Sequence, residues 1–309
     1  MALDVPTSTL LAQMAESGQP PLHEMDLEQA RGLTAGLKEM YGPGPAMVSA
    51  ERTMVDLGGR TIPIQFLVPI GDPRGLIVYY HGGGWTIGTI DEFETLGRQL
   101  AERTGCVVAL VDYRLAPEAP YPAAVDDAWD ALSWIAENME DVLGKRIPLI
   151  VAGDSAGGNL AAVVSQKARA GGPEISLQVL VYPVTDNDFE TASYRDPENQ
   201  LMLSRESMLW FWNHYAPEEV RKNADASPAR ADDLSGLPPA VLVTGEHDVL
   251  LDEGLAYGKA LETAGVPVSH RHFLGQMHGF FTMVNVLPGS AEALDFVTAE
   301  IDSVLSTRP

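Results

Sequence analysis

A serine stands between two glycines in the run Gly153-Asp154-Ser155-Ala156-Gly157. The apolar residues 148–152 before it are predicted to form a strand, and a helical pattern follows at once. A serine at such a strand-to-helix turn is the arrangement of a nucleophile elbow, where the glycines avoid clashes in the tight turn. The helix start also directs its positive dipole end and the Ala156 amide toward this point. The run therefore predicts a nucleophilic serine, with a merely helix-capping serine as the alternative.

A second run, His81-Gly82-Gly83-Gly84-Trp85, follows the predicted strand 76–80. Three successive glycines allow backbone amides to point into a cavity without side chains in the way. Such amides stabilise the oxyanion of a tetrahedral intermediate, which is what acyl transfer to a serine requires. A flexible glycine turn is the alternative, but it does not explain the position at the carboxyl end of a strand.

An acylating serine needs a base and an acid, which follow in the order serine, acid, histidine in folds with this elbow. The predicted strand 240–244 leads into a loop with Asp248. Asp252 and Glu253 fall where the next helix should begin and suit N-terminal capping. Asp248 is therefore the predicted acid.

The base is best supplied by His278, which follows the last predicted strand in a loop and has glycines on both sides. His270 and His272 alternate on a strand, so a metal pair is conceivable, but no third ligand lies at a suitable spacing. The remaining histidines have less suitable positions: His247 is too close to Asp248 in sequence, His214 lies in an aromatic helical segment, and His23 in the N-terminal arm.

Strand and helix patterns alternate along most of the chain after Thr53. Several of the predicted strands are continuous apolar runs, which is typical of strands buried on both faces of a parallel sheet. The alternation predicts a mostly parallel sheet with helices on both faces. The strands are predicted at 61–68, 76–80, 106–111, 148–152, 177–182, 240–244 and 268–273, and the helices at 123–138, 156–170, 252–264 and 290–305.

Two regions depart from this alternation. The N-terminal residues 8–18 and 26–41 are predicted to form helices before the first strand. Between Thr185 and Ser235 an irregular stretch leads into a helix at 204–215, which we interpret as an insertion over the edge of the sheet. Bulky side chains near the elbow, the oxyanion run or this helix are the candidates for the walls of a substrate pocket: Trp85, Met208, Phe211, Trp212, Tyr215, Phe280 and Phe281.

The composition narrows the class of protein. The 309 residues, 45% of them hydrophobic, can bury one large core. A formal charge of −23 disfavours nucleic acid and anionic membrane surfaces as partners. Cys106 is the only cysteine, which excludes an intrachain disulfide and suits a reducing cytoplasm. No signal peptide or membrane-spanning run is recognisable. The oligomeric state is left open, with a homo-oligomer as one option.

The chain resembles the bacterial hormone-sensitive lipase family of esterases, in its subgroup with the pentapeptide GDSAG. The similarity extends over nearly the whole chain. The matching motifs are His81 to Trp85, Asp112-Tyr113-Arg114-Leu115-Ala116-Pro117-Glu118, Tyr121-Pro122-Ala123-Ala124, Gly153 to Gly157, Asp248 to Gly254, and His278-Gly279-Phe280.

The resemblance implies an α/β-hydrolase fold with a mostly parallel eight-stranded sheet and a small helical cap. Residues 1–45 would form the N-terminal part of the cap, and residues 46–309 the catalytic domain, with a cap insertion at about 185–225. The oxyanion amides would be those of Gly83, Gly84 and Ala156. No metal or organic cofactor is expected. Val249 replaces the family's usual proline, and the preceding His247 is also unusual; both lie in the loop of the acid.

These features together predict a carboxylesterase that hydrolyses small esters of short to medium acyl chains through an acyl-enzyme. An amidase or peptidase is an alternative, since the same triad serves both reactions. A small-molecule receptor of the same fold is another, although the presence of His278 disfavours it. We interpret Arg114 and Glu118 as a structural charge pair near the oxyanion loop.

Overall fold

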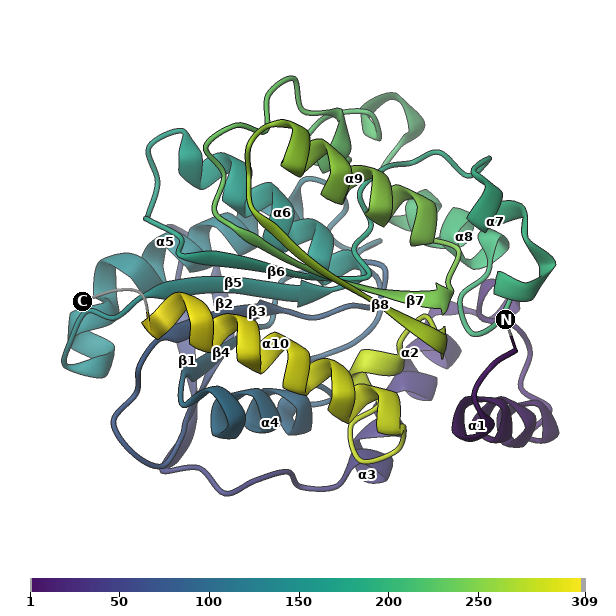
Figure 1. Ribbon diagram of the computed structural model, residues 1–309, viewed down its shortest axis with the longest axis horizontal. Helices are drawn as coiled ribbons and strands as arrows, with labels where there is room; N and C mark the ends of the chain where they lie inside the picture. Colours follow the sequence, from purple (N-terminus) through teal and green to yellow (C-terminus); the bar gives the residue numbers. More distant parts are fainter. Residues whose placement is uncertain (1, 307–309) are drawn as a thin grey trace.

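The computed structural model describes residues 2–306, and within them eight strands form one sheet (Figure 1). The strand order is β1-β2-β4-β3-β5-β6-β7-β8; β2 pairs antiparallel with β1 and β4, and the remaining neighbours are parallel. The predicted mostly parallel, eight-stranded α/β-hydrolase fold is confirmed. The strands are β1 (Ser49–Asp56), β2 (Thr61–Val68), β3 (Leu76–Tyr80), β4 (Val107–Val111), β5 (Leu149–Asp154), β6 (Leu177–Val181), β7 (Ala240–His247) and β8 (Val268–Met277).

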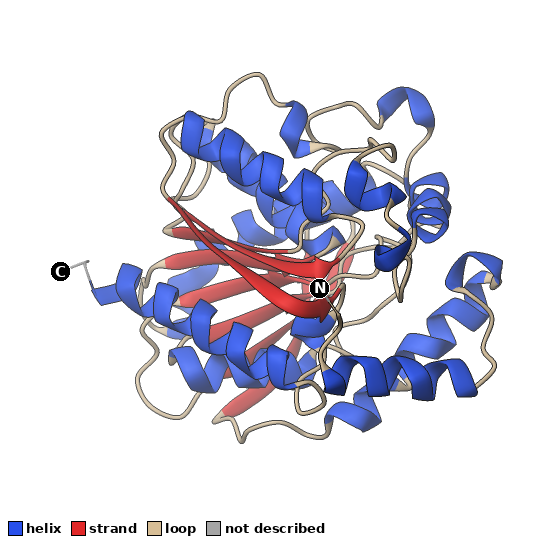
Figure 2. Ribbon diagram, turned by 45° about the vertical axis from the view of Figure 1, so that its right-hand side comes forward, coloured by secondary structure: helices blue, strands red, loops and turns tan. Residues whose placement is uncertain are grey.

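Helices cover both faces of the sheet (Figure 2). One face packs against α5 (Ala123–Leu143), α6 (Ala156–Arg169) and α9 (Leu251–Thr263), and the other against α4 (Glu94–Thr104) and α10 (Pro288–Ser306). None of the helices within residues 2–306 is long and apolar enough to cross a lipid bilayer.

The central strands are apolar throughout because both of their faces are buried. In β3, Val78 and Tyr80 belong to the core on the α5 and α6 side, whereas Ile77 and Tyr79 belong to the core under α4 and α10. All five residues of β3 are buried, as are all five of β4. Each such aliphatic or aromatic side chain gains about 1.5–3 kcal/mol when it leaves water, so these strands fix the position of the loops at their ends.

The N-terminal segment is helical, with bounds that differ from the prediction. It forms α1 (Val5–Glu16), the 3₁₀ turn η1 (Leu22–Glu24), α2 (Leu27–Ala35) and α3 (Leu37–Tyr41). The helix α1 starts before the predicted residue 8 because Asp4 caps it: the Thr7 amide donates to Asp4 Oδ1 at 2.7 Å, and proline is tolerated in a first turn. The predicted helix 26–41 is divided between α2 and α3 at Gly36, a residue with low helix propensity.

The connection between β6 and β7, residues 182–239, is the irregular stretch expected from the sequence. It contains the short helices α7 (Ala192–Arg195) and η2 (Pro197–Asn199), then α8 (Arg205–Tyr215), η3 (Glu218–Val220) and η4 (Pro228–Arg230). The helix α8 agrees with the predicted helix 204–215. Its buried face carries Met208, Phe211, Trp212 and Tyr215, and it packs against η1 of the N-terminal segment.

Candidate active site

Ser155, His278 and Asp248 come together at the carboxyl ends of β5, β8 and β7. His278 Nε2 lies 3.0 Å from Ser155 Oγ, and His278 Nδ1 lies 2.7 Å from Asp248 Oδ2. The serine and the histidine are 123 residues apart in sequence, but parallel strands end at the same edge of a sheet. The arrangement is able to remove the serine proton and to stabilise the resulting imidazolium with a buried carboxylate.

The elbow that carries Ser155 has the steric restriction expected of a sharp turn. Ser155 has φ +55°, which is rare for a residue with a side chain. A Cβ at Gly153 would lie 2.3 Å from the Gly157 backbone, and one at Gly157 would lie 1.9 Å from the Tyr80 carbonyl oxygen. Ser155 makes no side-chain capping bond to α6, so the helix-capping interpretation does not describe it.

The glycine run after β3 faces the elbow. Gly83 and Gly84 have φ of +104° and +55°. A Cβ at Gly84 would lie 2.1 Å from the Phe211 ring, and one at Gly83 would lie 2.2 Å from the Ile87 carbonyl oxygen, so both positions require glycine. Within residues 2–306, the amides of Gly83 and Gly84 donate to no protein acceptor. These two amides are therefore available to an acceptor outside the protein.

Asp154, beside Ser155, links the elbow to this run, a role that the sequence reasoning missed. Its Oδ1 accepts hydrogen bonds from the Tyr79 hydroxyl at 2.8 Å and from the Gly82 amide at 3.0 Å. Burial raises the pKa of Asp154 to about 6, although both hydrogen bonds act against that rise. The motif contained the residue, but only the fold shows that Gly82 lies next to it.

The loop of Asp248 is bound to the β6–β7 connection. Asp248 is buried, and its Oδ1 accepts from the Leu250 amide at 2.9 Å. Asp252, expected to cap α9, instead accepts from the Ser193 amide at 2.8 Å. Glu253, expected to do the same, accepts from the amides of Thr185 and Asp186. Burial raises the pKa of Glu253 well above its usual range.

The predicted pocket walls fall into two groups. Trp85 stacks on Tyr215 at a ring distance of 4.0 Å and meets Trp212 edge-on at 5.0 Å, while Phe211 covers Gly84. Met208 is buried on the same helix face. Phe280 and Phe281 do not join this cluster, because they pack into the core on the α4 and α10 side.

The two histidines of β8 that were considered as a metal pair share a hydrogen-bond partner. His270 and His272 both hydrogen-bond to Thr244 Oγ1, at 2.9 and 3.0 Å. No group of three or more His, Cys, Asp or Glu side chains among residues 2–306 is arranged to hold a metal ion.

The proposed pairing of Arg114 with Glu118 is wrong: Arg114 pairs with Asp127 at 2.8 Å, and Glu118 with Arg31 of α2 at 2.8 Å. The sequence reasoning overlooked Arg31, which also donates to the carbonyls of Thr86 and Ala116 beside the oxyanion run.

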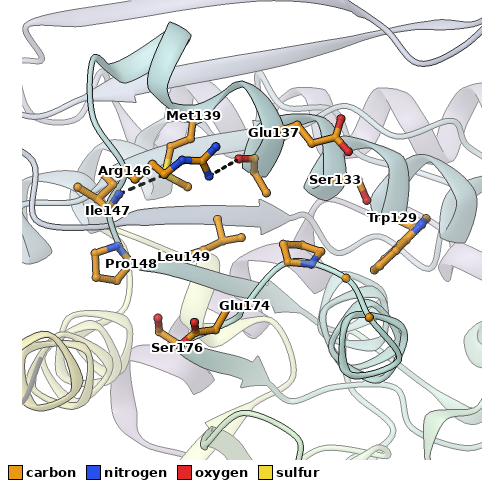
Figure 3. A pocket seen from close by; sticks show the side chains of 14 residues that line it. Trp129, Ser133, Glu137, Met139, Arg146, Ile147, Pro148, Leu149, Glu174 and Ser176 are labelled. Carbon is orange, nitrogen blue, oxygen red and sulfur yellow. Dashed lines mark hydrogen bonds between the residues drawn. The ribbon is translucent and has the colours of Figure 1, made fainter.

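Two open cavities lie away from the triad. One of about 660 Å³ lies at the opposite edge of the sheet, beside the start of β5, where Trp129, Arg146, Leu149 and Ser176 are among its walls (Figure 3). Another, of about 940 Å³, lies between α2 and the loops that follow β3 and β4. Neither wall includes a triad residue. Ser155 itself is only 7% exposed, so its side chain lies under the surrounding segments.

Comparisons with known proteins agree with the fold. A family described as alpha/beta hydrolase fold matches residues 77–282. A carboxylesterase of Mycobacterium tuberculosis, NlhH, is 39% identical over 86% of this chain and 86% of its own length. An ethyl acetate hydrolase of Pseudomonas putida is 32% identical over 95% of this chain and 96% of its own length. The solved structure of an ester hydrolase from the metagenome of Lake Arreo has a TM-score of 0.93 and 34% identity, and covers 99% of this chain and 100% of that one.

The burial of Asp154 predicts that its ionisation lowers the free energy of unfolding, and that this loss depends on pH. Because the pKa in the folded state is raised to about 6, wild-type protein loses stability as pH rises from about 4 through 6. The substitution Asp154→Asn keeps an acceptor oxygen and removes the charge. Above pH 7 the variant should exceed the wild type in unfolding free energy by about 2–3 kcal/mol, and near pH 4 the gain should vanish. Urea unfolding at both pH values measures this difference.

A matched control is Asp127, a second buried aspartate. Burial acts to raise the pKa of Asp127, but its hydrogen bonds to Arg114 and Arg60 outweigh that effect and lower it. Asp127→Asn should therefore lose stability at neutral pH, and the loss should shrink as pH falls. A stability difference for Asp154→Asn that does not change with pH would contradict this description of the elbow.

Proposed function

The chain belongs to the α/β-hydrolase family, in its hormone-sensitive-lipase-like branch, and is an ester hydrolase; we propose that it cleaves short- to medium-chain carboxylic esters through an acyl-enzyme on Ser155. The observation that carries the proposal is the continuous hydrogen-bonded path from Ser155 Oγ through His278 to Asp248, with distances of 3.0 and 2.7 Å. Matching geometry of nucleophile, base and orienting acid is the signature of covalent serine catalysis.

In the first half-reaction Ser155 Oγ attacks the ester carbonyl carbon while His278 Nε2 takes the hydroxyl proton. Asp248 stabilises the imidazolium and holds the ring in the tautomer whose Nε2 is free to accept. The tetrahedral intermediate then collapses, and the alkoxide leaves with the proton from His278. In the second half, His278 activates a water molecule, which releases the carboxylic acid and restores Ser155.

The oxyanion is assigned to the amides of Gly83, Gly84 and Ala156. The first two lie in a run that Asp154 ties to the elbow, and the third begins α6 next to the nucleophile. Donors of this kind each supply about 3–4 kcal/mol of transition-state stabilisation. No cofactor is needed for this chemistry.

The two helical regions are assigned to a cap over this site, residues 1–45 and about 185–225, on a catalytic domain that forms the rest of the chain. The packing of α8 on η1 joins the two regions, and Phe211 of α8 covers the oxyanion run. This position makes α8 the element that limits the size of the acyl group. The proposed walls of the acyl pocket are Trp85, Met208, Phe211, Trp212 and Tyr215. Phe280 and Phe281 would instead support the loop of His278 from the core on the α4 and α10 side.

Esters are favoured over amides because the curated relatives reported above are named for ester hydrolysis, one of them for ethyl acetate. A receptor role is disfavoured by the intact triad.

The proposed location is the cytoplasm, where the buried thiol of Cys106 stays reduced. The acidic surface suits small neutral substrates rather than nucleic acid or anionic lipid.

Ser155→Ala tests the assignment of the nucleophile. The hydroxyl is a reacting group, so hydrolysis of 4-nitrophenyl acetate should fall by at least about a thousandfold while circular dichroism shows an unchanged fold. Ser165→Ala is the matched control, because this buried serine of α6 donates only to the Ala161 carbonyl, and it should keep full activity. Retention of a tenth of wild-type turnover by Ser155→Ala would exclude Ser155 as the nucleophile.

Acyl-chain length tests the role of α8. An acyl group gains about 0.8 kcal/mol per buried methylene until the aromatic walls block it, so kcat/KM should be highest between about C2 and C8 and fall steeply beyond. Phe211→Ala opens space beside Gly84 and should move the optimum to longer chains. A series of 4-nitrophenyl esters of increasing acyl length measures this optimum. The control is Trp210→Ala, which changes a half-buried residue of the same helix. An unchanged length profile in Phe211→Ala, or a wild-type preference for emulsified long-chain triglycerides, would count against this pocket.

A further inference from the structure

The loop that carries the catalytic acid, residues 248–252, is attached to the β6–β7 connection by a small group of buried polar contacts. We call these residues the acid loop. Its backbone carbonyls at Val249 and Asp248 accept hydrogen bonds from Ser193 of α7 and Asn199 of η2. Residues 248–250 of this loop lie between β7 and α9, and residues 251–252 begin α9. Because residues 248–250 belong to no hydrogen-bonded ladder, contacts from other segments contribute to their conformation.

Ser193 makes most of these contacts. Its hydroxyl donates to the Val249 carbonyl at 2.7 Å and accepts from the Asp252 amide at 3.2 Å, while its amide donates to Asp252 Oδ2 at 2.8 Å. The side chain is 5% exposed, so water competes little for these bonds. One serine thus binds both ends of the segment that follows Asp248.

Asn199 completes the group from η2. Its amide nitrogen donates to the Ser193 carbonyl at 2.9 Å and to the Asp248 carbonyl at 3.3 Å. On the other side of the loop, the Asp248 carboxylate divides its oxygens between the Leu250 amide and His278 Nδ1. The backbone carbonyl of Asp248 is therefore bound by Asn199, while the carboxylate of the same residue binds His278.

The sequence gives a reason why these contacts matter in this chain. Val249 has no ring to fix its φ, and its amide donates to no protein group within residues 2–306. Without the bond from Ser193, the peptide unit between Val249 and Leu250 would keep only the bond from the Leu250 amide to Asp248 Oδ1 and would rotate more easily, whereas the Asp248 carbonyl would still be bound. Such a rotation would move the Asp248 carboxylate, which must stay within hydrogen-bond distance of His278.

We propose that Ser193 is a positioning residue of the reaction, acting through Asp248 by fixing the acid loop. The inference rests on the triad assigned above as the proposed function. It also makes the β6–β7 connection part of the catalytic machinery as well as a wall of the pocket, because the segment that covers the site also holds its acid.

Ser193→Ala tests the proposal. The variant should lower kcat for 4-nitrophenyl acetate about tenfold and leave KM within about twofold, because Ser193 is not among the groups proposed to contact substrate. Ser193→Thr keeps the hydroxyl and should restore most of the lost kcat. The matched control is Ser227→Ala, which removes another buried hydroxyl of the same connection, one that donates to the Arg221 carbonyl at 2.6 Å. That variant should keep wild-type kcat even where its melting temperature falls.

A double-mutant cycle with Asp248→Asn separates positioning from a merely structural role. If Ser193 acts through Asp248, adding Ser193→Ala to Asp248→Asn should change the residual rate by less than about twofold. The same tenfold loss in both backgrounds, or equal kcat for Ser193→Ala and Ser193→Thr, would overturn the proposal, as would wild-type kcat in Ser193→Ala. A fully active Asp248→Asn would instead refute the triad assigned under the proposed function, so the two failures are distinguishable.

Discussion

The contact between the elbow and the end of β3 is the constraint on which the site depends. A Cβ at Gly157 would lie 1.9 Å from the Tyr80 carbonyl oxygen, so the first turn of α6 touches the backbone of the neighbouring strand. That contact brings the glycine run after β3 next to Ser155. Ser155 and the glycine run therefore share one edge of the sheet, and their relative position comes from the pairing of β3 with β5 rather than from flexible side chains.

Around this edge, buried polar groups join loops that the sheet alone would leave independent. Asp154 connects the elbow to the oxyanion run, Arg31 connects α2 to the loop beyond that run, and Ser193 connects the β6–β7 connection to the acid loop. Each link uses backbone amides or carbonyls, which have fixed directions. The consequence is a site that is organised before substrate arrives, at the expense of a charged Asp154 held away from water.

The sequence predicted the features that have a local cause. The elbow and the glycine run can be recognised in the sequence because steric crowding requires glycine at particular positions. The central strands can be recognised because burial on both faces requires a continuous run of apolar residues. The strand β1 was missed because it is an edge strand with mostly exposed side chains, and β7 and β8 continue past their apolar portions to His247 and Met277. In β7 and β8 the apolar pattern ends several residues before the hydrogen bonds between the strands end.

Most of the contacts that were missed join residues far apart in sequence. Arg31 is 87 residues from Glu118, and Ser193 is 56 residues from Val249, so no spacing in the chain indicates either pair. Asp252 and Glu253 were expected to cap α9 because acidic residues at a helix start usually do so. Their partners are backbone amides of the β6–β7 connection, which only the tertiary fold brings near.

The most direct measurement of the central claim is the location of a covalent adduct. A 4-nitrophenyl alkylphosphonate phosphonylates the serine that His278 activates, with release of nitrophenol, and the adduct resembles the tetrahedral intermediate. We expect complete loss of esterase activity at one adduct per chain, and mass spectrometry of the peptides should place that adduct on Ser155. An adduct on another residue, or inactivation with Ser155 unmodified, would contradict the account.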